Sequence, residues 1–157
     1  MKAVLQRVSQ ARVTAEDQVL GQIGKGLLVL LGVAQGDEDE DARILALKTA
    51  NLRIFSDAQS KFNLSLLEAD GQALVISQFT LLADSRRGRR PSFDKAAAPE
   101  IAETLVDRYA QFLREEGVSV ENGRFGAHML VEIHNDGPVT IVLDTRELTK
   151  PRRSDGT

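Results

Sequence analysis

The sequence predicts a single α+β domain, with a mainly antiparallel, barrel-like β-sheet core and two helices. The chain has 157 residues, which suits one compact domain. Hydrophobic residues make up 42% and charged residues 27%, a balance that can bury a core without disulfides or a structural metal. Short runs rich in β-branched residues alternate with turn residues, and only two segments have helical periodicity.

The first third of the chain is predicted to be β-structure. Strands are expected at residues 4–8, 11–15 and 19–23, with turns at Ser9 and Gln10 and at Glu16 and Asp17. Another turn follows at residues 24–26. Residues 27–33 are apolar on both faces, which is typical of a central strand.

Two helices are predicted from apolar faces that follow a start signal. An acidic run at residues 37–41 precedes the first, because carboxylates favour the positive end of the helix dipole; a metal-binding loop is the alternative. Pro99 begins the second helix at its favoured first position, and Gly117 ends it. The apolar faces comprise Ile44, Leu45, Leu47 and Leu52 in the first helix, and Ile101, Leu105, Tyr109, Phe112 and Leu113 in the second.

The remaining segments complete the sheet. A short strand or turn is expected at residues 53–57, a strand at 72–82, a surface loop at 84–94, and final strands at 118–120, 129–133 and 139–143. Residues 1–144 would thus form the domain. Residues 145–157 are polar and lack an apolar anchor, so they are predicted to be a flexible C-terminal tail.

The composition excludes several classes of protein. The absence of cysteine removes disulfides, thiolate catalysis and cysteine-based zinc sites, and it is compatible with a reducing cytosol. The N-terminal segment has no signal-peptide pattern, and no apolar run approaches the roughly 20 residues of a membrane span. We therefore expect a cytoplasmic protein with no membrane partner. A net charge of -3 argues against binding nucleic acid through bulk positive charge.

No conventional catalytic motif is present. The only histidines, His128 and His134, have no zinc-binding spacing, and there is no G-x-S-x-G elbow. Neither a metal nor another cofactor is expected, and the histidine pair is predicted to be structural or exposed. A Ser-His-Asp triad assembled from distant segments stays open.

Two segments combine polar and turn-forming residues in patterns that suit a site. Ser77, Gln78, Phe79 and Thr80 follow an apolar run, which would place hydrogen-bonding groups at a sheet edge; an ordinary strand end is the alternative. Residues 135–140 have the pattern of a hairpin turn. The Gly137–Pro138 bond within them is a candidate for the cis form, which would turn two neighbouring carbonyls to the same side.

Together these segments resemble the two signature motifs of the D-aminoacyl-tRNA deacylase family, of the D-Tyr-tRNA deacylase type. The resemblance covers residues 1–144. It includes the segments at residues 5–8, 26–33, 53–57, 87–93 and 123–129. His128 departs from the pattern, since an acidic residue is expected there in many relatives.

The resemblance implies an enzyme that proofreads translation by hydrolysing the ester bond of D-aminoacyl-tRNA, and of glycyl-tRNA, while rejecting the L-form. It implies a homodimer with the active site at the interface, where a cis Gly137–Pro138 unit reaches into the partner's pocket and selects chirality. The catalytic side, next to the ester and the 3′-terminal adenosine, would comprise Ser77, Gln78, Phe79 and Thr80. Supporting roles would fall to Arg7, Asn135 and Thr140.

The resemblance also implies a chemistry that depends on the substrate. Backbone N–H groups near Phe79 and Thr80 are candidate oxyanion donors. Thr80 as a nucleophile would need an adjacent base, and none is apparent. The family view assigns much of the chemistry to the 2′-hydroxyl of the substrate's own ribose.

A cluster of arginines supplies local positive charge in an acidic chain. Arg86, Arg87, Arg89 and Arg90 are predicted to contact phosphates at the tRNA acceptor end; a solvated surface loop is the alternative. Two other functions stay open. An amidase or esterase that depends on Thr80 or Ser77 would act on small D-amino-acid compounds. A dimeric binding module would use the arginines for nucleic acid or an acidic partner, without catalysis.

Overall fold

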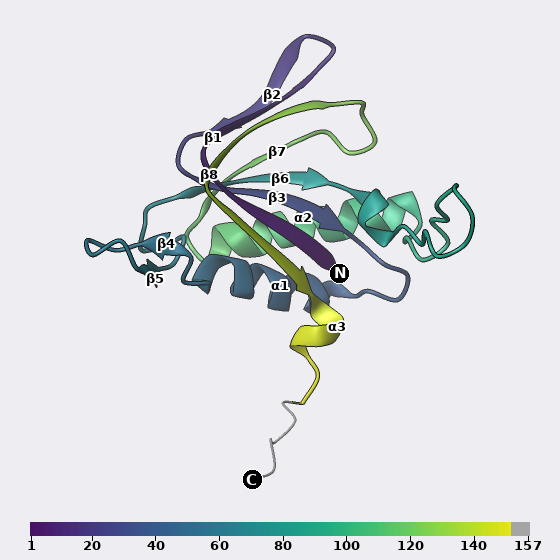
Figure 1. The fold of residues 1–157 in the computed structure, drawn as a ribbon. Coiled ribbons are helices and arrows are strands. Elements are labelled where there is room, and N and C mark those ends of the chain that lie inside the picture. Colours follow the sequence, from purple (N-terminus) through teal and green to yellow (C-terminus); the bar gives the residue numbers. More distant parts are fainter. Residues whose placement is uncertain (152–157) are drawn as a thin grey trace.

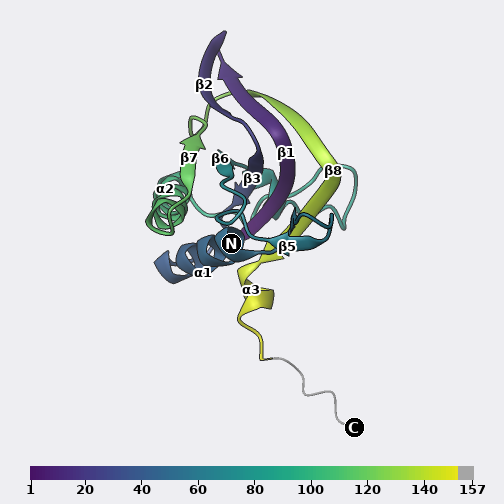
Figure 2. The same cartoon turned by 90° about the vertical axis from the view of Figure 1, so that its left-hand side faces the viewer.

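A six-stranded mixed sheet forms the centre of the computed structural model, which describes residues 1–151 (Figure 1). Its strands are β1 (Lys2–Ala15), β2 (Gln18–Ile23), β3 (Gly26–Gly32), β6 (Gln72–Ser77), β7 (Ser119–Asn122) and β8 (Leu130–Asp144). They lie in the order β2-β1-β3-β6-β7, and β8 pairs with the other edge of β1. β1 and β8 are long and bent, so the sheet curls into a partly closed barrel (Figure 2).

Helices α1 (Asp39–Asn51) and α2 (Pro99–Glu115) lie side by side on one face of the sheet (Figure 1). The main core lies between them and the sheet, and includes Leu5, Leu31, Leu45, Tyr109 and Leu113. A smaller cluster fills the concave face of the curled sheet. The predicted α+β class with a barrel-like core is confirmed.

The acidic run before α1 is a helix start, as predicted. Glu38 is the N-cap, and its backbone N–H donates to the Asp41 carboxylate at 2.8 Å, which satisfies a donor that the helix leaves open. The alternative of a metal-binding loop has no support within residues 1–151, where no group of three potential ligands is placed to hold an ion.

The connections through the helices differ from the prediction. The sheet was expected to be mainly antiparallel, but β3 pairs with β6 and β6 with β7 in parallel. α1 and α2 are the crossovers that return the chain to the same end of the sheet, which parallel neighbours require. Within the six-stranded sheet of residues 1–151, the antiparallel pairings are those of β1 with β2, β3 and β8.

Two of the predicted turns do not exist. Ser9 and Gln10 lie inside β1, and residues 135–140 lie inside β8, so four predicted strands merge into two. The β1–β8 register shifts between Gln6 and Gln10, so bulges, rather than turns, absorb these residues. The turn at Glu16 and Asp17 is confirmed; both have positive φ, as a tight hairpin requires.

Smaller differences concern the ends of elements. The strand predicted at residues 72–82 ends at Ser77, and a short 3₁₀ helix, η1 (Phe79–Leu82), follows. The small ribbon of β4 (Phe55–Ser56) and β5 (Phe62–Leu64) has a second strand that was not expected. Ile101, assigned to the apolar face of α2, is 54% exposed, because the buried face of α2 passes through the adjacent Ala102 instead.

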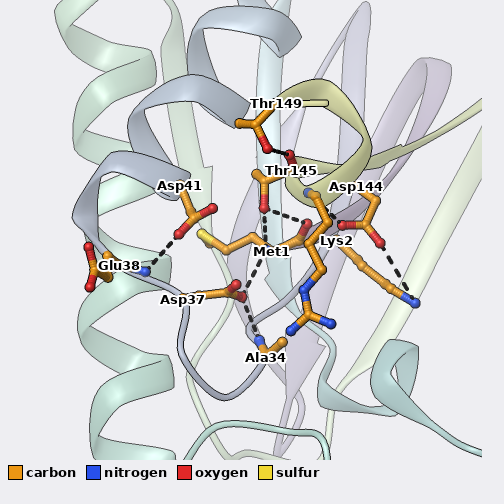
Figure 3. A network of polar contacts seen from close by, with 10 residues as sticks. Met1, Lys2, Ala34, Asp37, Glu38, Asp41, Asp144, Thr145 and Thr149 are labelled. Carbon is orange, nitrogen blue, oxygen red and sulfur yellow. Dashed lines mark hydrogen bonds and ion pairs between the residues drawn. The ribbon is translucent and has the colours of Figure 1, made fainter. Parts of the chain in front are cut away.

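The segment after Asp144 begins with a further helix, α3 (Thr145–Leu148). Thr145 is fully buried, and its backbone N–H donates to the Met1 carbonyl at 2.9 Å (Figure 3). The tail predicted from residue 145 is therefore held at its start by hydrogen bonds, and Leu148 packs against the main core, so the prediction that this segment lacks an apolar anchor is wrong. Residues 152–157 of that tail lie outside the described residues. No helix within residues 1–151 has the length and hydropathy to cross a membrane.

Candidate functional site

A cleft of about 520 Å³ opens where β6 ends. Three segments line it: the end of β6 with the start of η1, the segment before α2, and the loop before β8. Its lining includes Ser77, Gln78, Phe79, Ala96, Ala97, Phe125, His128 and Met129. A larger hollow of about 790 Å³, between α1 and α3, contains none of the predicted site residues.

The predicted catalytic segment reaches this cleft because it lies at the carboxyl end of β6. Ser77 pairs with Leu31 of β3, and the Gln78 N–H donates to the Leu31 carbonyl at 2.8 Å. Phe79 turns outward, and its ring meets Phe93 edge-on, with centroids 5.1 Å apart. Thr80 is exposed and is not among the lining residues; its hydroxyl accepts a hydrogen bond from the Gln78 side-chain amide.

The cleft offers little acid–base chemistry of its own. His128 is the one titratable side chain among its described lining residues, and no carboxylate lines it. His134 does not line the cleft; it is exposed on β8, 3.4 Å from the Gln10 side-chain amide of β1. The lining alanines and Phe125 were not predicted, because small apolar residues in loops carry no chemical signal in a sequence.

The second motif lies on the exposed part of β8. The Gly137–Pro138 bond is cis, and Gly137 has a φ of +128°. A Cβ atom at Gly137 would stand 2.9 Å from Val139 Cγ2 and 3.0 Å from an Arg7 nitrogen, both too close. Only glycine therefore fits this position, for reasons of both backbone conformation and space.

Arg7 is the side chain that fixes this motif to the sheet. It is buried, with 8% exposure, and its Nε donates to the Asp136 carbonyl at 3.0 Å. Its Nη1 donates to the Ile54 carbonyl at 2.8 Å, and its guanidinium lies 5.3 Å from the Phe62 ring centroid. This is the position that the supporting role expected of Arg7 requires.

The other two residues expected to support the motif lie along the same β1–β8 pairing. Thr140 donates from its hydroxyl to Gln6 Oε1 at 2.6 Å. Asn135 is exposed and pairs with Val8.

Within one chain, the two motifs lie on different strands, Ser77 at the end of β6 and Gly137 near the middle of β8. Ser77 is level with Leu31, and Leu31 with Ala3 of β1. Gly137 lies next to the Gln6–Val8 part of β1, on the far edge. About five residues along the strands and three strand spacings separate them, which amounts to roughly 20 Å. One chain therefore does not bring the two predicted halves of the site together.

The arginine cluster forms a closed loop between η1 and the cleft wall. Two backbone hydrogen bonds between Asp84 and Ser92, at 2.8 and 2.9 Å, close it. Arg86 pairs with Asp84 at 2.5 Å, and its guanidinium holds the pKa of that carboxyl well below its usual range. The other three, Arg87, Arg89 and Arg90, are exposed and form no ion pair with any residue of the 1–151 segment.

A sequence model of one protein family, described as D-Tyr-tRNA(Tyr) deacylase, matches residues 4–144. The chain belongs to this family. The "D-aminoacyl-tRNA deacylase" of Roseiflexus sp. (strain RS-1) is 62% identical over 152 residues, covering 97% of this chain and 98% of that protein. The protein of the same name from Dehalococcoides mccartyi (strain ATCC BAA-2100) is 58% identical, covering 97% and 99%.

Two solved structures share the deacylase fold. A "c-Myc DNA Unwinding Element Binding Protein" has a TM-score of 0.86 at 38% identity, covering 92% of this chain and 98% of that one. A probable eukaryotic D-amino acid tRNA deacylase has a TM-score of 0.75 over 90% and 97% of the two chains. Its 20% identity supports the fold alone. The prediction that the chain is a deacylase, an ester hydrolase, is confirmed at the level of the family; the roles of individual residues stay predictions.

Proposed function

We propose that this chain hydrolyses the ester bond of D-aminoacyl-tRNA in the cytosol, and so removes D-amino acids before translation uses them. The observation that carries the proposal is the family match over residues 4–144, together with full-length relatives that are named for this activity. The products are the free D-amino acid and a tRNA with its terminal ribose hydroxyl restored. Glycyl-tRNA is the second substrate, because glycine has no side chain to exclude.

The complete site is built from two copies of the chain. Gly137 and Pro138 are exposed, and they lie too far from Ser77 to share a substrate within one chain. β8, which carries them, pairs only with β1 among the described strands and exposes Leu130 and Val142. A two-fold axis would place β8 of each copy on the cleft of the other, since such interfaces are reciprocal.

In the cleft, water attacks the ester carbonyl and the developing oxyanion needs donors. Phe79 and Thr80 are the first residues of η1, and amides in a first helical turn have no intrahelical acceptor. Their N–H groups are therefore the donors that we assign to the oxyanion. Because no carboxylate lines the cleft and Thr80 has no base beside it, the 2′-hydroxyl of the substrate assists the proton transfer.

Chirality is selected by exclusion. The carbonyls of the partner's Gly137–Pro138 unit accept hydrogen bonds from the substrate's α-ammonium group, while the cleft holds the ester. With both groups held, an L side chain would point into a backbone wall, and a D side chain would point to solvent. The hydrogen bonds of Arg7 stiffen this wall. A clash can discriminate strongly where a missing attraction cannot.

The arginine loop binds the acceptor end of the tRNA. Arg87, Arg89 and Arg90 lack carboxylate partners in the described chain, so they are available to phosphates, whereas Arg86 is already paired with Asp84. This arrangement reconciles a net charge of -3 with a tRNA substrate.

The direct test measures the hydrolysis of D-Tyr-tRNA, L-Tyr-tRNA and glycyl-tRNA by the purified protein. We expect rapid loss of the D and glycyl esters only. Equal hydrolysis of the L ester would contradict selection of chirality by a backbone wall. Hydrolysis of small D-amino-acid esters that carry no tRNA would favour the alternative of a simple esterase.

The shared site has its own test, with two inactive variants. Gln78→Ala damages the cleft half, and Gly137→Ala damages the β8 half. After subunit exchange, mixed dimers contain one site with both halves intact, so the mixture should regain about a quarter of the native activity. A mixture that stays as inactive as its components would contradict a site shared between chains.

A binding module without catalysis is the second candidate. The arginines without an ion-pair partner in residues 1–151 favour it, as does the structural neighbour at 38% identity, which is named as a DNA unwinding element binding protein. It predicts binding of tRNA without hydrolysis of any ester, with loss of binding in Arg89→Ala and no effect of Gly137→Ala.

A further inference from the structure

An aromatic ring of the β4–β5 ribbon contacts the arginine that holds the second motif. The guanidinium carbon of Arg7 lies over the Phe62 ring, 5.3 Å from its centroid. This distance is within the limit of about 6 Å for a cation–π contact. Phe62 is itself 55% exposed, whereas Arg7 is 8% exposed. Part of the cover of this buried cation is therefore a ring that lies at the surface.

The ribbon holds Phe62 in this place. Phe62 begins β5 and pairs with Ser56 of β4. The Asp57 carboxylate closes the turn between the two strands, because it accepts hydrogen bonds from the Gln59 and Lys61 N–H groups at 2.9 and 3.0 Å. The Asp57 N–H also donates to the Lys61 carbonyl at 2.9 Å. The ring is thus carried by a closed, hydrogen-bonded turn.

The ribbon and the second motif are both bonded to the guanidinium of Arg7. Its Nη1 donates to the carbonyl of Ile54, the residue before β4, and its Nε donates to the Asp136 carbonyl. A guanidinium donates only in its own plane, so these two bonds do not prevent it from tilting out of that plane. Contact with the Phe62 ring restricts this tilt and the approach of water to the two carbonyls.

We propose that Phe62 is a positioning residue for the selection of chirality. Its ring keeps the guanidinium of Arg7 on the carbonyl of Asp136, the residue that precedes Gly137. Gly137 lies against the same guanidinium, since a Cβ atom there would stand 3.0 Å from Arg7 Nη2. Without the ring, Arg7 exchanges its carbonyl acceptors for water more often, and the backbone wall that excludes an L side chain becomes less rigid. This inference rests on the proposed function, which assigns that wall to Gly137 and Pro138.

The first measurement is the ratio of kcat/KM for D-Tyr-tRNA to kcat/KM for L-Tyr-tRNA. Phe62→Leu retains a large apolar side chain but has no aromatic face, so we expect this ratio to fall about fivefold, the scale of one cation–π contact. Phe62→Tyr retains the aromatic face and should retain the native ratio. Rescue by tyrosine but not by leucine distinguishes the contact with Arg7 from simple apolar packing.

The second measurement follows Arg7 itself and needs no substrate. Exchange of its Nε–H proton with water, observed by NMR of the nitrogen-labelled protein, reports how firmly this group is bonded to the Asp136 carbonyl. Exchange should be about fivefold faster in Phe62→Leu than in the native protein, and native in Phe62→Tyr. Because Phe62 is more than half exposed, both variants should fold.

Val19→Ala is the matched control. Val19 is also 55% exposed, and it pairs with Thr14 of β1, seven residues along the strand from Arg7. Both measurements should stay native in this variant.

Native exchange in Phe62→Leu would overturn the proposal. Faster exchange with a native D-to-L ratio would overturn it as well, since the ring would then have no effect on chirality. If the native protein hydrolyses neither ester, the proposed function is contradicted, while the exchange measurement still decides whether Phe62 holds Arg7.

Discussion

Replacement of Arg7 tests whether a buried cation holds the second motif in place. Arg7→Met retains the length and the apolar stem of the side chain but removes every donor. Two carbonyls, those of Ile54 and Asp136, then lose hydrogen bonds of 2.8 and 3.0 Å. The side chain is 8% exposed, so water cannot readily replace the lost donors.

The expected loss of stability follows from these two hydrogen bonds. A hydrogen bond from a charged donor contributes about 1.5 to 3 kcal/mol, so the loss of both should lower the free energy of unfolding by about 3 to 6 kcal/mol. With a slope near 2 kcal/mol per molar urea, the unfolding midpoint moves down by about 2 M. Arg7→Lys, whose single ammonium can reach only one of the carbonyls, should lose about half as much.

The assay is urea unfolding at one fixed protein concentration, because dimerisation makes stability depend on concentration. Arg12→Met is the matched control on the same strand: Arg12 is exposed and pairs with Glu132 at the surface, so the midpoint should not move measurably. If the free energy of unfolding of Arg7→Met lies within about 1 kcal/mol of the native value, the buried hydrogen bonds do not hold β8 as argued.

Three further predictions concern separate parts of the molecule. Gly137→Ala places a methyl group 2.9 Å from Val139 Cγ2 at a φ of +128°, so kcat/KM for D-Tyr-tRNA should fall at least about tenfold; near-native turnover would contradict the packing argument. Burial raises the pKa of Tyr109 above its ordinary value of 10.0, so the unfolded chain loses this proton first and stability falls as pH rises above 10.0. Tyr109→Phe should flatten that alkaline decline and cost about 1 kcal/mol at neutral pH, as measured by urea unfolding across pH; an unchanged slope would exclude this phenol as its source. Arg89→Ala with Arg90→Ala should raise KM for the tRNA substrate and reduce the salt dependence of log kcat/KM by about one per lost phosphate contact; an unchanged salt slope would place the tRNA elsewhere.

Much of the fold could be read from local patterns. The central strand at residues 27–33, the acidic start of α1, Pro99 at the start of α2 and the turn at Glu16 and Asp17 all appear where the sequence indicates. Each depends on neighbours within a few residues: apolar runs, capping carboxylates, or positive φ. Such signals depend only on residues that are close in sequence, so a single sequence is enough to predict these elements.

The errors in the predicted fold arise where contacts between distant segments determine the secondary structure and the strand pairing. Polar residues at Ser9, Gln10 and 135–140 have the pattern of turns, but the pairing of β1 with β8 keeps them in strands and absorbs the extra residues as bulges. Likewise, the parallel pairing of β3, β6 and β7 depends on where α1 and α2 return the chain. No local sequence pattern predicts whether these strands pair parallel or antiparallel.

The candidate site shows the same division. The sequence by itself indicated the family and the residues of both motifs, because their chemistry depends on rare combinations of residue types. Only the tertiary structure showed which backbone carbonyls accept the hydrogen bonds of Arg7 and that alanines line the cleft. It also separated the two motifs by roughly 20 Å, since strand register and strand order, not spacing along the chain, determine which residues meet.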